Sequence, residues 1–306
     1  MPGPLLAIVG PTASGKSKAA LLVAERFGAE IVSVDSMTVY RGMDIGTAKP
    51  TLEDRMRVPH HLVDVAEPEE EFSVARYQHL ARRALEDIDA RGSRPLLVGG
   101  TGLYFRAIVD ELSFPPTDPD ARRVLEIEAQ STGPEKLYRR LHELDPEAAR
   151  KIEPSNVRRT VRALEVAAVT GRRFSSFAED WERYRDHSVR AAGVVIPPDI
   201  LAERIEQRVQ SQIDAGFVEE VRELLDRGAG PSLTARQAIG YAEMVEHLSG
   251  RITLEDAIRR TVKRTRALAR RQMAWFRRDP RIRWFTARRS GAVEVASELT
   301  EYLADA

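Results

Sequence analysis

The feature that most constrains the fold of this chain is a glycine-rich segment near its start. Residues 10–17 read GPTASGKS and match the pattern G-x-x-x-x-G-K-[ST] at every fixed position. An apolar run, residues 5–9, precedes the segment, and apolar side chains at helical spacing follow it. A strand, a glycine-rich loop and a helix in this order predict a phosphate-binding loop rather than an ordinary turn.

Each part of this loop suits the binding of a polyphosphate. Glycines at both ends let the backbone wrap its N–H groups around phosphate oxygens, and Lys16 supplies a positive charge. The Ser17 hydroxyl is offered to Mg²⁺, the one cofactor that we expect. The predicted phosphate-binding residues are Gly10, Pro11, Thr12, Ala13, Ser14, Gly15, Lys16 and Ser17.

Short apolar runs predict a parallel sheet that is buried on both faces. They cover residues 5–9, 30–34, 61–65, 95–99 and 191–196, and helical patterns separate the first four. The fold class is therefore α/β, with a P-loop NTPase-like parallel sheet core whose ligands bind at the carboxyl ends of the strands.

The texture of the sequence changes between residues 113 and 188, where the turn-rich segment FPPTDP is followed by helical patterns without strand signals. We assign residues 1–112 to the first part of the α/β core and residues 113–188 to a helical insertion domain. Residues 189–306 complete the core and add a helical, basic C-terminal region.

Composition limits the classes of partner and chemistry. The 47 basic and 47 acidic residues balance, so any affinity for nucleic acid must come from local clustering. The absence of cysteine excludes disulfides and thiolate catalysis. Met1 leads directly into the first strand, and no apolar run approaches about 18 residues. We therefore expect a soluble, cytoplasmic monomer without a membrane partner.

Polar residues follow two further predicted strands. Asp35 comes after residues 30–34, and GGTG, which includes Thr101, comes after residues 95–99. Because parallel strands end at one edge of the sheet, both should converge on the phosphate loop. Asp35 is placed to act as a general base, although an N-cap or a carboxylate behind a magnesium ion explains it equally well. A tight turn would also explain GGTG.

A basic cluster lies near the end of the chain. Residues 257–289 hold thirteen Lys or Arg and one acid, Asp279. Arg266 and Arg270 belong to a helical stripe that predicts contacts with nucleic acid phosphates, and a solvated helix face is the alternative. The aromatic residues nearby, Trp275 among them, are expected to be core anchors.

Seven segments resemble, in order, those of the tRNA dimethylallyltransferases. They are GPTASGKS, DSMTVYRGMDIGTAKP (35–50), PHHLVDV (59–65), GGTGLYFRA (99–107), RALEV (162–166), AIGYAE (238–243) and RTRALARRQMAWFR (264–277). The resemblance implies transfer of the dimethylallyl group from dimethylallyl diphosphate to the exocyclic amine of the adenosine 3′ of the anticodon in tRNA, at position 37. It also implies that the insertion helps to grip the anticodon stem-loop.

The resemblance further implies roles for single residues. Asp35 would be the base, Thr101 its hydrogen-bonding partner across the site, and Lys16 a ligand of the leaving diphosphate together with Arg208, for which Arg204 is a rival. Thr38 stands where the family pattern has Gln, and its shorter side chain reaches less of the target base. The implied tRNA contacts are Asp35, Ser36, Met37, Thr38, Thr101, Arg122, Arg158, Arg159, Thr160, Val161, Arg162, Arg236, Gln237, Gly240 and Tyr241, to which the basic stripe adds Arg266 and Arg270.

Two other functions fit parts of the sequence. A small-molecule kinase that uses ATP would share the strand, loop and helix at the start of the chain. A nucleic-acid-binding switch that hydrolyses a nucleotide would need a magnesium-binding aspartate after a strand, and Asp64 is the candidate. The pair His60-His61 has no carboxylate at metal-ligand spacing, which favours packing over zinc binding.

Overall fold

The computed structural model describes residues 4–177, 184–185, 189–227, 232–287 and 292–304. The chain divides into two compact units. One consists of Met1–Asp110 together with Arg185–Ala306, and the other of Glu111–Tyr184.

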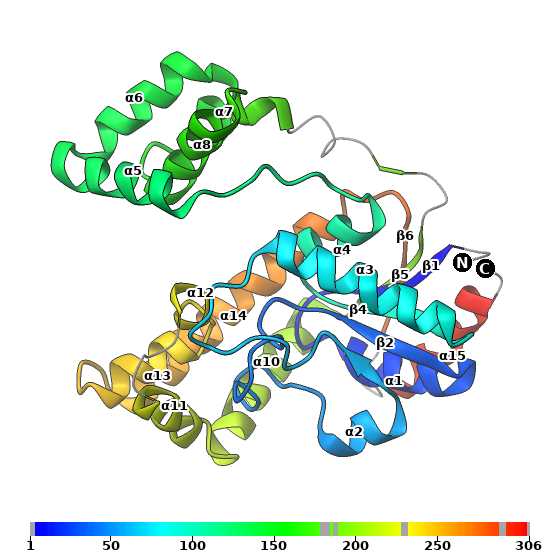
Figure 1. Ribbon diagram of the computed structural model, residues 1–306. Helices are drawn as coiled ribbons and strands as arrows, with labels where there is room; N and C mark the ends of the chain where they lie inside the picture. Colours follow the sequence, from blue (N-terminus) through cyan, green and yellow to red (C-terminus); the bar gives the residue numbers. More distant parts are fainter. Residues whose placement is uncertain (1–3, 178–183, 186–188, 228–231, 288–291, 305–306) are drawn as a thin grey trace. The chain divides into compact units, whose positions relative to one another are not determined.

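A parallel sheet forms the centre of the first unit (Figure 1). In the described residues it has six strands in the order β3-β2-β4-β1-β5-β6. All neighbouring strands are parallel, which confirms the α/β fold class. The strands are β1 (Leu5–Val9), β2 (Ala29–Val34), β3 (His60–His61), β4 (Arg94–Gly99), β5 (Val189–Val195) and β6 (Ile282–Thr286).

Two strands differ from the sequence prediction. Strand β3 covers only His60–His61 instead of residues 61–65. Leu62 and Asp64 have φ values of 62° and 57°, and a left-handed residue cannot continue a strand. Strand β6 was not predicted; it pairs with β5 and lies at the edge of the sheet.

Helices cover both faces of the sheet. Ala7 and Val9 of β1 face one hydrophobic cluster, whereas Leu6 and Ile8 face the other, because successive side chains of a strand point to opposite sides. The first cluster includes residues of α3 (Val74–Ala90), α4 (Gly102–Val109) and α14 (Leu254–Phe276). The second includes residues of α1 (Lys16–Phe27) and α15 (Ala292–Ala304).

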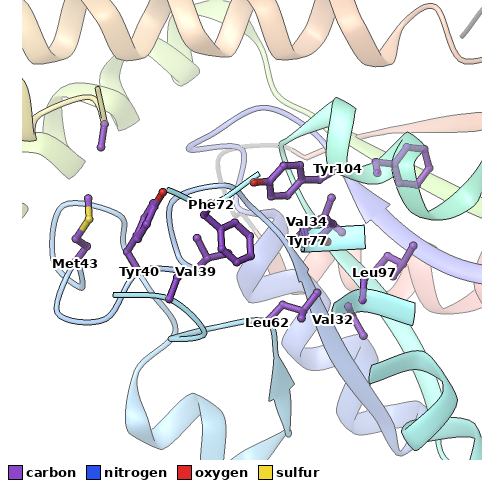
Figure 2. Packing of buried hydrophobic residues seen from close by; sticks show 14 of the residues in the cluster. Val32, Val34, Val39, Tyr40, Met43, Leu62, Phe72, Tyr77, Leu97 and Tyr104 are labelled. Carbon is purple, nitrogen blue, oxygen red and sulfur yellow. The ribbon is translucent and has the colours of Figure 1, made fainter. Parts of the chain in front are cut away.

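Aromatic packing fixes α3 against the end of β2. Figure 2 shows Tyr77 and Tyr104 next to Val34, and their rings stack with centroids 3.9 Å apart. The Tyr77 hydroxyl donates a hydrogen bond to the Ser33 carbonyl oxygen at 2.8 Å. A buried tyrosine needs such a partner, and this one ties the helix to the strand that leads to Asp35.

The remaining helices of this unit lie beyond the carboxyl ends of the strands or beside them. Helix α10 packs against α14 and α11, and α13 packs against α11 and α14. These remaining helices are α2 (Leu52–Arg57), α10 (Pro198–Asp214), α11 (Phe217–Asp226), α12 (Leu233–Arg236) and α13 (Tyr241–Leu248).

A buried ion-pair network joins the two points at which the chain leaves and re-enters this unit. Arg281 donates to Asp110 Oδ1 at 2.7 Å and to the carbonyl oxygen of Arg185 at 3.0 Å. The Arg185 N–H in turn donates to Asp110 Oδ1 at 3.2 Å. Asp279 and Arg106 complete the network, each 2.7 Å or less from its partner. The two chain crossings are therefore held side by side.

The second unit is helical in its described part. Its helices are α5 (Pro119–Thr132), α6 (Pro134–Leu144), α7 (Pro146–Lys151), α8 (Val157–Thr170) and the 3₁₀ turn η1 (Phe174–Phe177). Proline begins three of these helices, as its fixed φ favours. Across the described ranges of the whole chain, no helix combines the length and the apolar character needed to cross a membrane.

Candidate active site

The glycine-rich loop joins β1 to α1 at the carboxyl edge of the sheet, as predicted. Gly10 must be glycine, because a Cβ there would lie 2.5 Å from the carbonyl oxygen of Val194. Gly15 has a φ of 87° and forms the N-cap of α1 without a side-chain hydrogen bond. The first N–H groups of α1 are therefore left for an anion.

Two cations stand beside this loop. Lys16 Nζ donates to the Pro11 carbonyl oxygen at 3.1 Å, and Arg208 of α10 donates to Thr12 Oγ1 at 3.2 Å. Burial lowers the pKa of Lys16 to about 8, with Asp35 opposing this shift and Arg208 adding to it. Burial also lowers the pKa of Arg208. Closely spaced, partly desolvated positive charges of this kind favour a polyanionic ligand.

Both candidate arginines of α10 reach the loop. Arg208 lines the cavity described below and also donates to the Thr47 carbonyl oxygen at 3.3 Å. Arg204, one turn earlier, places Nη1 3.4 Å from where a Cβ on Gly15 would be. Arg208 therefore faces the cavity, and Arg204 covers the loop at the start of α1.

A cavity of about 640 Å³ opens next to the loop. This volume falls within the range of about 300–1,000 Å³ that is typical of small-molecule sites. Several of the residues predicted from the sequence line it, namely Thr12, Lys16, Ser17, Asp35, Ser36, Met37, Thr38, Thr101, Arg208, Gln237 and Tyr241. The structure thus brings together residues from the ends of β1, β2 and β4 and from α10.

Asp35 uses one carboxylate oxygen to hold its own loop. Oδ1 accepts hydrogen bonds from the N–H groups of Met37 at 2.8 Å and Thr38 at 3.4 Å. No hydrogen bond within the described residues engages Oδ2. The capping role and the general-base role, left open by the sequence, are therefore compatible: one oxygen orients the carboxylate and the other is open to a substrate proton.

Thr101 connects the ends of β2 and β4. Its Oγ1 accepts a hydrogen bond from the Ser36 N–H at 3.2 Å. Thr38 is only 7% exposed, and its hydroxyl is 3.0 Å from Ser33 Oγ. The Thr38 hydroxyl is thus already engaged inside the protein, consistent with its short reach toward a base.

Two residues that were not predicted to act together hold the loop of residues 44–49 along the cavity, Glu220 and Tyr241. Glu220 of α11 accepts hydrogen bonds from the N–H groups of three successive residues, 44–46, at 2.7–3.2 Å. It also accepts one from the Tyr241 hydroxyl at 2.6 Å. Burial raises the pKa of Tyr241, and Glu220 adds to the shift. Nothing in the local pattern of α11 signals this role.

Gln272 of α14 was missed as well. Its Oε1 accepts a hydrogen bond from the Thr12 N–H at 2.8 Å, and its Nε2 donates to the Gly100 carbonyl oxygen at 2.9 Å. One amide group therefore links the phosphate loop to the GGTG turn. The only signal available from the sequence was its place inside the segment RTRALARRQMAWFR.

The second unit holds six of the residues with an implied tRNA contact. Arg122 and Arg162 both pair at 3.1 Å with Glu165, which is fully buried. Thr160 and Val161 are 1% and 3% exposed, so their side chains face the interior. In this segment the side chains of 158 and 159, both arginines, are exposed.

In the first unit, Arg236 and Gln237 are exposed, whereas Gly240 and Tyr241 are buried. Gly240 has a φ of 93°, and a Cβ there would lie 2.8 Å from the Phe217 ring. Gly240 therefore serves the packing of α11 against α13, while Gln237 reaches the cavity.

The basic stripe of α14 is more neutral than its sequence indicates. Arg266 pairs with Glu206 of α10 at 2.6 Å, and other arginines of α14 pair with Asp256, Glu243 and Glu246. In the described part of the chain, Lys263 and Arg270 are exposed and have no acidic partner within ion-pair distance. Phe276 is fully buried as expected, but Trp275 is 37% exposed and packs on Gly102.

The aspartate that a nucleotide switch would need is engaged elsewhere. Asp64 pairs with Lys49 at 2.6 Å and with Arg55 at 2.7 Å. Burial opposes its ionisation, but the hydrogen bonds and charges of Lys49 and Arg55 outweigh burial and lower its pKa. His60 and His61 likewise contact the Val58 carbonyl oxygen and Glu30. The described residues hold no group of three or more His, Cys, Asp or Glu that suits a metal ion.

Comparisons with known proteins agree with the geometry. Residues 38–279 match the model of the IPP transferase family, and residues 3–60 match that of the isopentenyl transferases. The tRNA dimethylallyltransferase of Geobacter metallireducens is 49% identical over 92% of this chain and 91% of its own length. That of Thermomicrobium roseum is 44% identical over 97% of this chain and 91% of its own length.

Solved structures show the same likeness. The tRNA isopentenylpyrophosphate transferase from Bacillus halodurans has a TM-score of 0.71 and 40% identity, covering 99% of this chain and 97% of that one. A eukaryotic dimethylallyltransferase acting on tRNA has a TM-score of 0.78 and 27% identity, covering 94% of this chain and 75% of that one.

Proposed function

The chain belongs to the IPP transferase family, and on that premise we propose that it transfers the dimethylallyl group of dimethylallyl diphosphate to the exocyclic amine of adenosine 37 in tRNA. Diphosphate is the second product. The observation that carries this proposal is that one cavity is lined both by a phosphate loop with two half-buried cations and by Asp35.

The loop side of the cavity suits a leaving group. As the bond between the allylic carbon and the diphosphate oxygen breaks, negative charge builds on the diphosphate. The N–H groups at the start of α1, Lys16 and Arg208 are placed to stabilise that charge without reorganising. Mg²⁺ would add further charge stabilisation, with Ser17 and the diphosphate oxygens as its ligands.

The other side of the cavity suits the nucleophile. The lone pair of an adenine amine is delocalised into the ring, so removal of the amine proton as the C–N bond forms should accelerate the reaction by about 10²–10⁴-fold. Asp35 Oδ2 is the acceptor for that proton, because Oδ1 is held by two backbone N–H groups. Thr101 lies at the end of β4, next to the end of β2 that carries Asp35, and its hydroxyl can orient the adenine.

We infer that the tRNA partner binds through its anticodon stem-loop. An adenine must leave its stack to reach a cavity, and the cost is smallest in a loop. The exposed cations at positions 158, 159, 263 and 270 are suited to phosphate contacts, which position a nucleic acid without reading its sequence. Arg266 contributes less, because Glu206 already neutralises it.

Label transfer tests the proposal directly. The protein is incubated with Mg²⁺, unmodified tRNA and dimethylallyl diphosphate that carries its label in the allyl group, and in parallel with γ-labelled ATP. We expect the label of the allyl group to appear in the tRNA. We expect no transfer of the label from ATP. Transfer of the ATP label to an acceptor, without allyl transfer, would overturn the proposal and favour the kinase alternative.

A further inference from the structure

The side-chain amide of Gln272 bridges two loops that belong to opposite sides of the cavity. The Thr12 N–H requires an acceptor and the Gly100 carbonyl requires a donor, so the orientation of the amide is fixed by its partners. Thr12 belongs to the phosphate loop, and Gly100 precedes Thr101, the residue that holds the Ser36 N–H beside Asp35.

Close packing supports the same bridge. A Cβ on Gly100 would lie 2.5 Å from Gln272 Nε2, and a Cβ on Gly102 would lie 2.0 Å from the Trp275 ring. The last turn of α14 therefore packs directly against the GGTG turn. Glycines are needed at positions 100 and 102, because a side chain there would clash with this helix. The contact is close enough for α14 to set the position of this turn.

We propose that Gln272 is a positioning residue that sets the spacing between the diphosphate loop and the turn carrying Thr101. This inference rests on the proposed function. In a transfer reaction the leaving group and the incoming amine must stand in line across the allylic carbon, and a displacement of about 1 Å can cost about 10²-fold in rate. Loss of the bridge should therefore slow the chemical step while each substrate still finds its own half of the site.

The helix itself does not depend on this amide. Phe276, one turn further, is fully buried and packs edge-on against Phe105 with ring centroids 6.0 Å apart. Because this contact anchors the end of α14, the effect of the Gln272 amide can be separated from that of helix docking.

Two substitutions of similar length probe the bridge. Gln272→Met removes both hydrogen bonds, and we expect the single-turnover rate at saturating substrates to fall about 10- to 100-fold. The affinity for dimethylallyl diphosphate, measured without tRNA, should change less than threefold. Phe276→Leu is the matched control: it should lower the thermal unfolding temperature and leave the single-turnover rate within threefold.

Gln272→Glu adds a readout that a purely structural role would not move. The protonated carboxyl group can accept from Thr12 and donate to Gly100 as the amide does, whereas the carboxylate has no proton to donate and repels the carbonyl oxygen. The rate of this variant relative to the unmodified chain should therefore rise severalfold as the pH falls from 8 to 5.5.

The outcomes separate this inference from the proposed function. If the unmodified chain transfers no allyl group, the proposed function itself fails. Only the positioning role is refuted if the unmodified chain is active and two further results are found. The single-turnover rate of Gln272→Met is then within threefold of that of the unmodified chain, and the relative rate of Gln272→Glu does not change with pH. Equal rate losses in Gln272→Met and Phe276→Leu would also refute it. Should Gln272→Met fail to fold, the pH response of Gln272→Glu decides.

Discussion

Binding of dimethylallyl diphosphate should depend on pH through Lys16. In the free protein, burial lowers the pKa of Lys16 to about 8, while the charge of Asp35 opposes the shift and that of Arg208 adds to it. A bound diphosphate places negative charge against Nζ and raises this pKa. Below pH 8 the ammonium is already present before binding, whereas above pH 8 binding must recruit a proton.

The number of protons taken up on binding follows from the pKa of Lys16 in the free protein and its pKa in the complex. If the pKa in the complex lies above about 10, binding takes up about 0.5 proton at pH 8 and about 0.9 at pH 9. The Kd should then rise by about tenfold between pH 7 and pH 9. The ligand contributes little in this range, because a terminal phosphate loses its last proton near pH 6.

Calorimetric titration of the diphosphate without tRNA measures this uptake directly. Each titration at pH 7, 8 and 9 is run in two buffers of different ionisation enthalpy, and the difference gives the number of protons bound. Lys16→Arg is the control, because its side chain stays charged and should bind with no proton uptake at any of these pH values. Equal Kd values at pH 7 and pH 9, or no uptake at pH 9, would refute the assignment of Lys16 to the diphosphate.

Four further substitutions test the other parts of the site and the basic stripe. Asp35→Asn keeps the Oδ1 hydrogen bonds but removes the base, so the single-turnover rate should fall about 10²-fold or more, and a rate within a few-fold would leave Asp35 only its capping role. Thr101→Ala should cost about 0.5–1.5 kcal/mol in the same assay, and a larger cost than that of Asp35→Asn would require the two roles to be reassigned. Arg270→Gln should lower the slope of log affinity for tRNA against log salt by about 0.7. Arg266→Gln should change the slope less, because Glu206 already pairs with Arg266, and identical slopes for both variants and the unmodified chain would indicate a face that does not touch tRNA.

The parts of the site that were predictable from the sequence are those with local causes. Gly10 and Gly15 lie within one short loop, and both the strand before it and the helix after it carry their own hydrophobic periodicity. Asp35 and Thr101 could be placed near that loop without knowledge of the strand order, because all carboxyl ends of a parallel sheet meet at one edge.

The parts that were missed depend on residues far apart in the sequence. Gln272 meets Thr12 across 260 positions, and its local helical pattern is the same whether or not its amide bridges two loops. The charge of Arg266 is neutralised by an acid 60 positions away on α10, which a count of charges within one segment cannot detect. Likewise, the early end of β3 depends on the left-handed conformation of Leu62, which an apolar run does not signal.

The ion-pair network of Arg281, Asp110 and Arg185 affects how the chain tolerates insertions and deletions between positions 110 and 185. Every residue between positions 110 and 185 belongs to one excursion whose two ends are fastened inside the other unit. The entropic cost of closing such a loop grows only with the logarithm of its length. Lengthening or shortening the excursion should therefore alter the folding free energy of the sheet-containing unit very little. A substitution at Arg281, in contrast, removes contacts to both ends at once and leaves the hydrogen bond from the Arg185 N–H to Asp110 as a direct link between them.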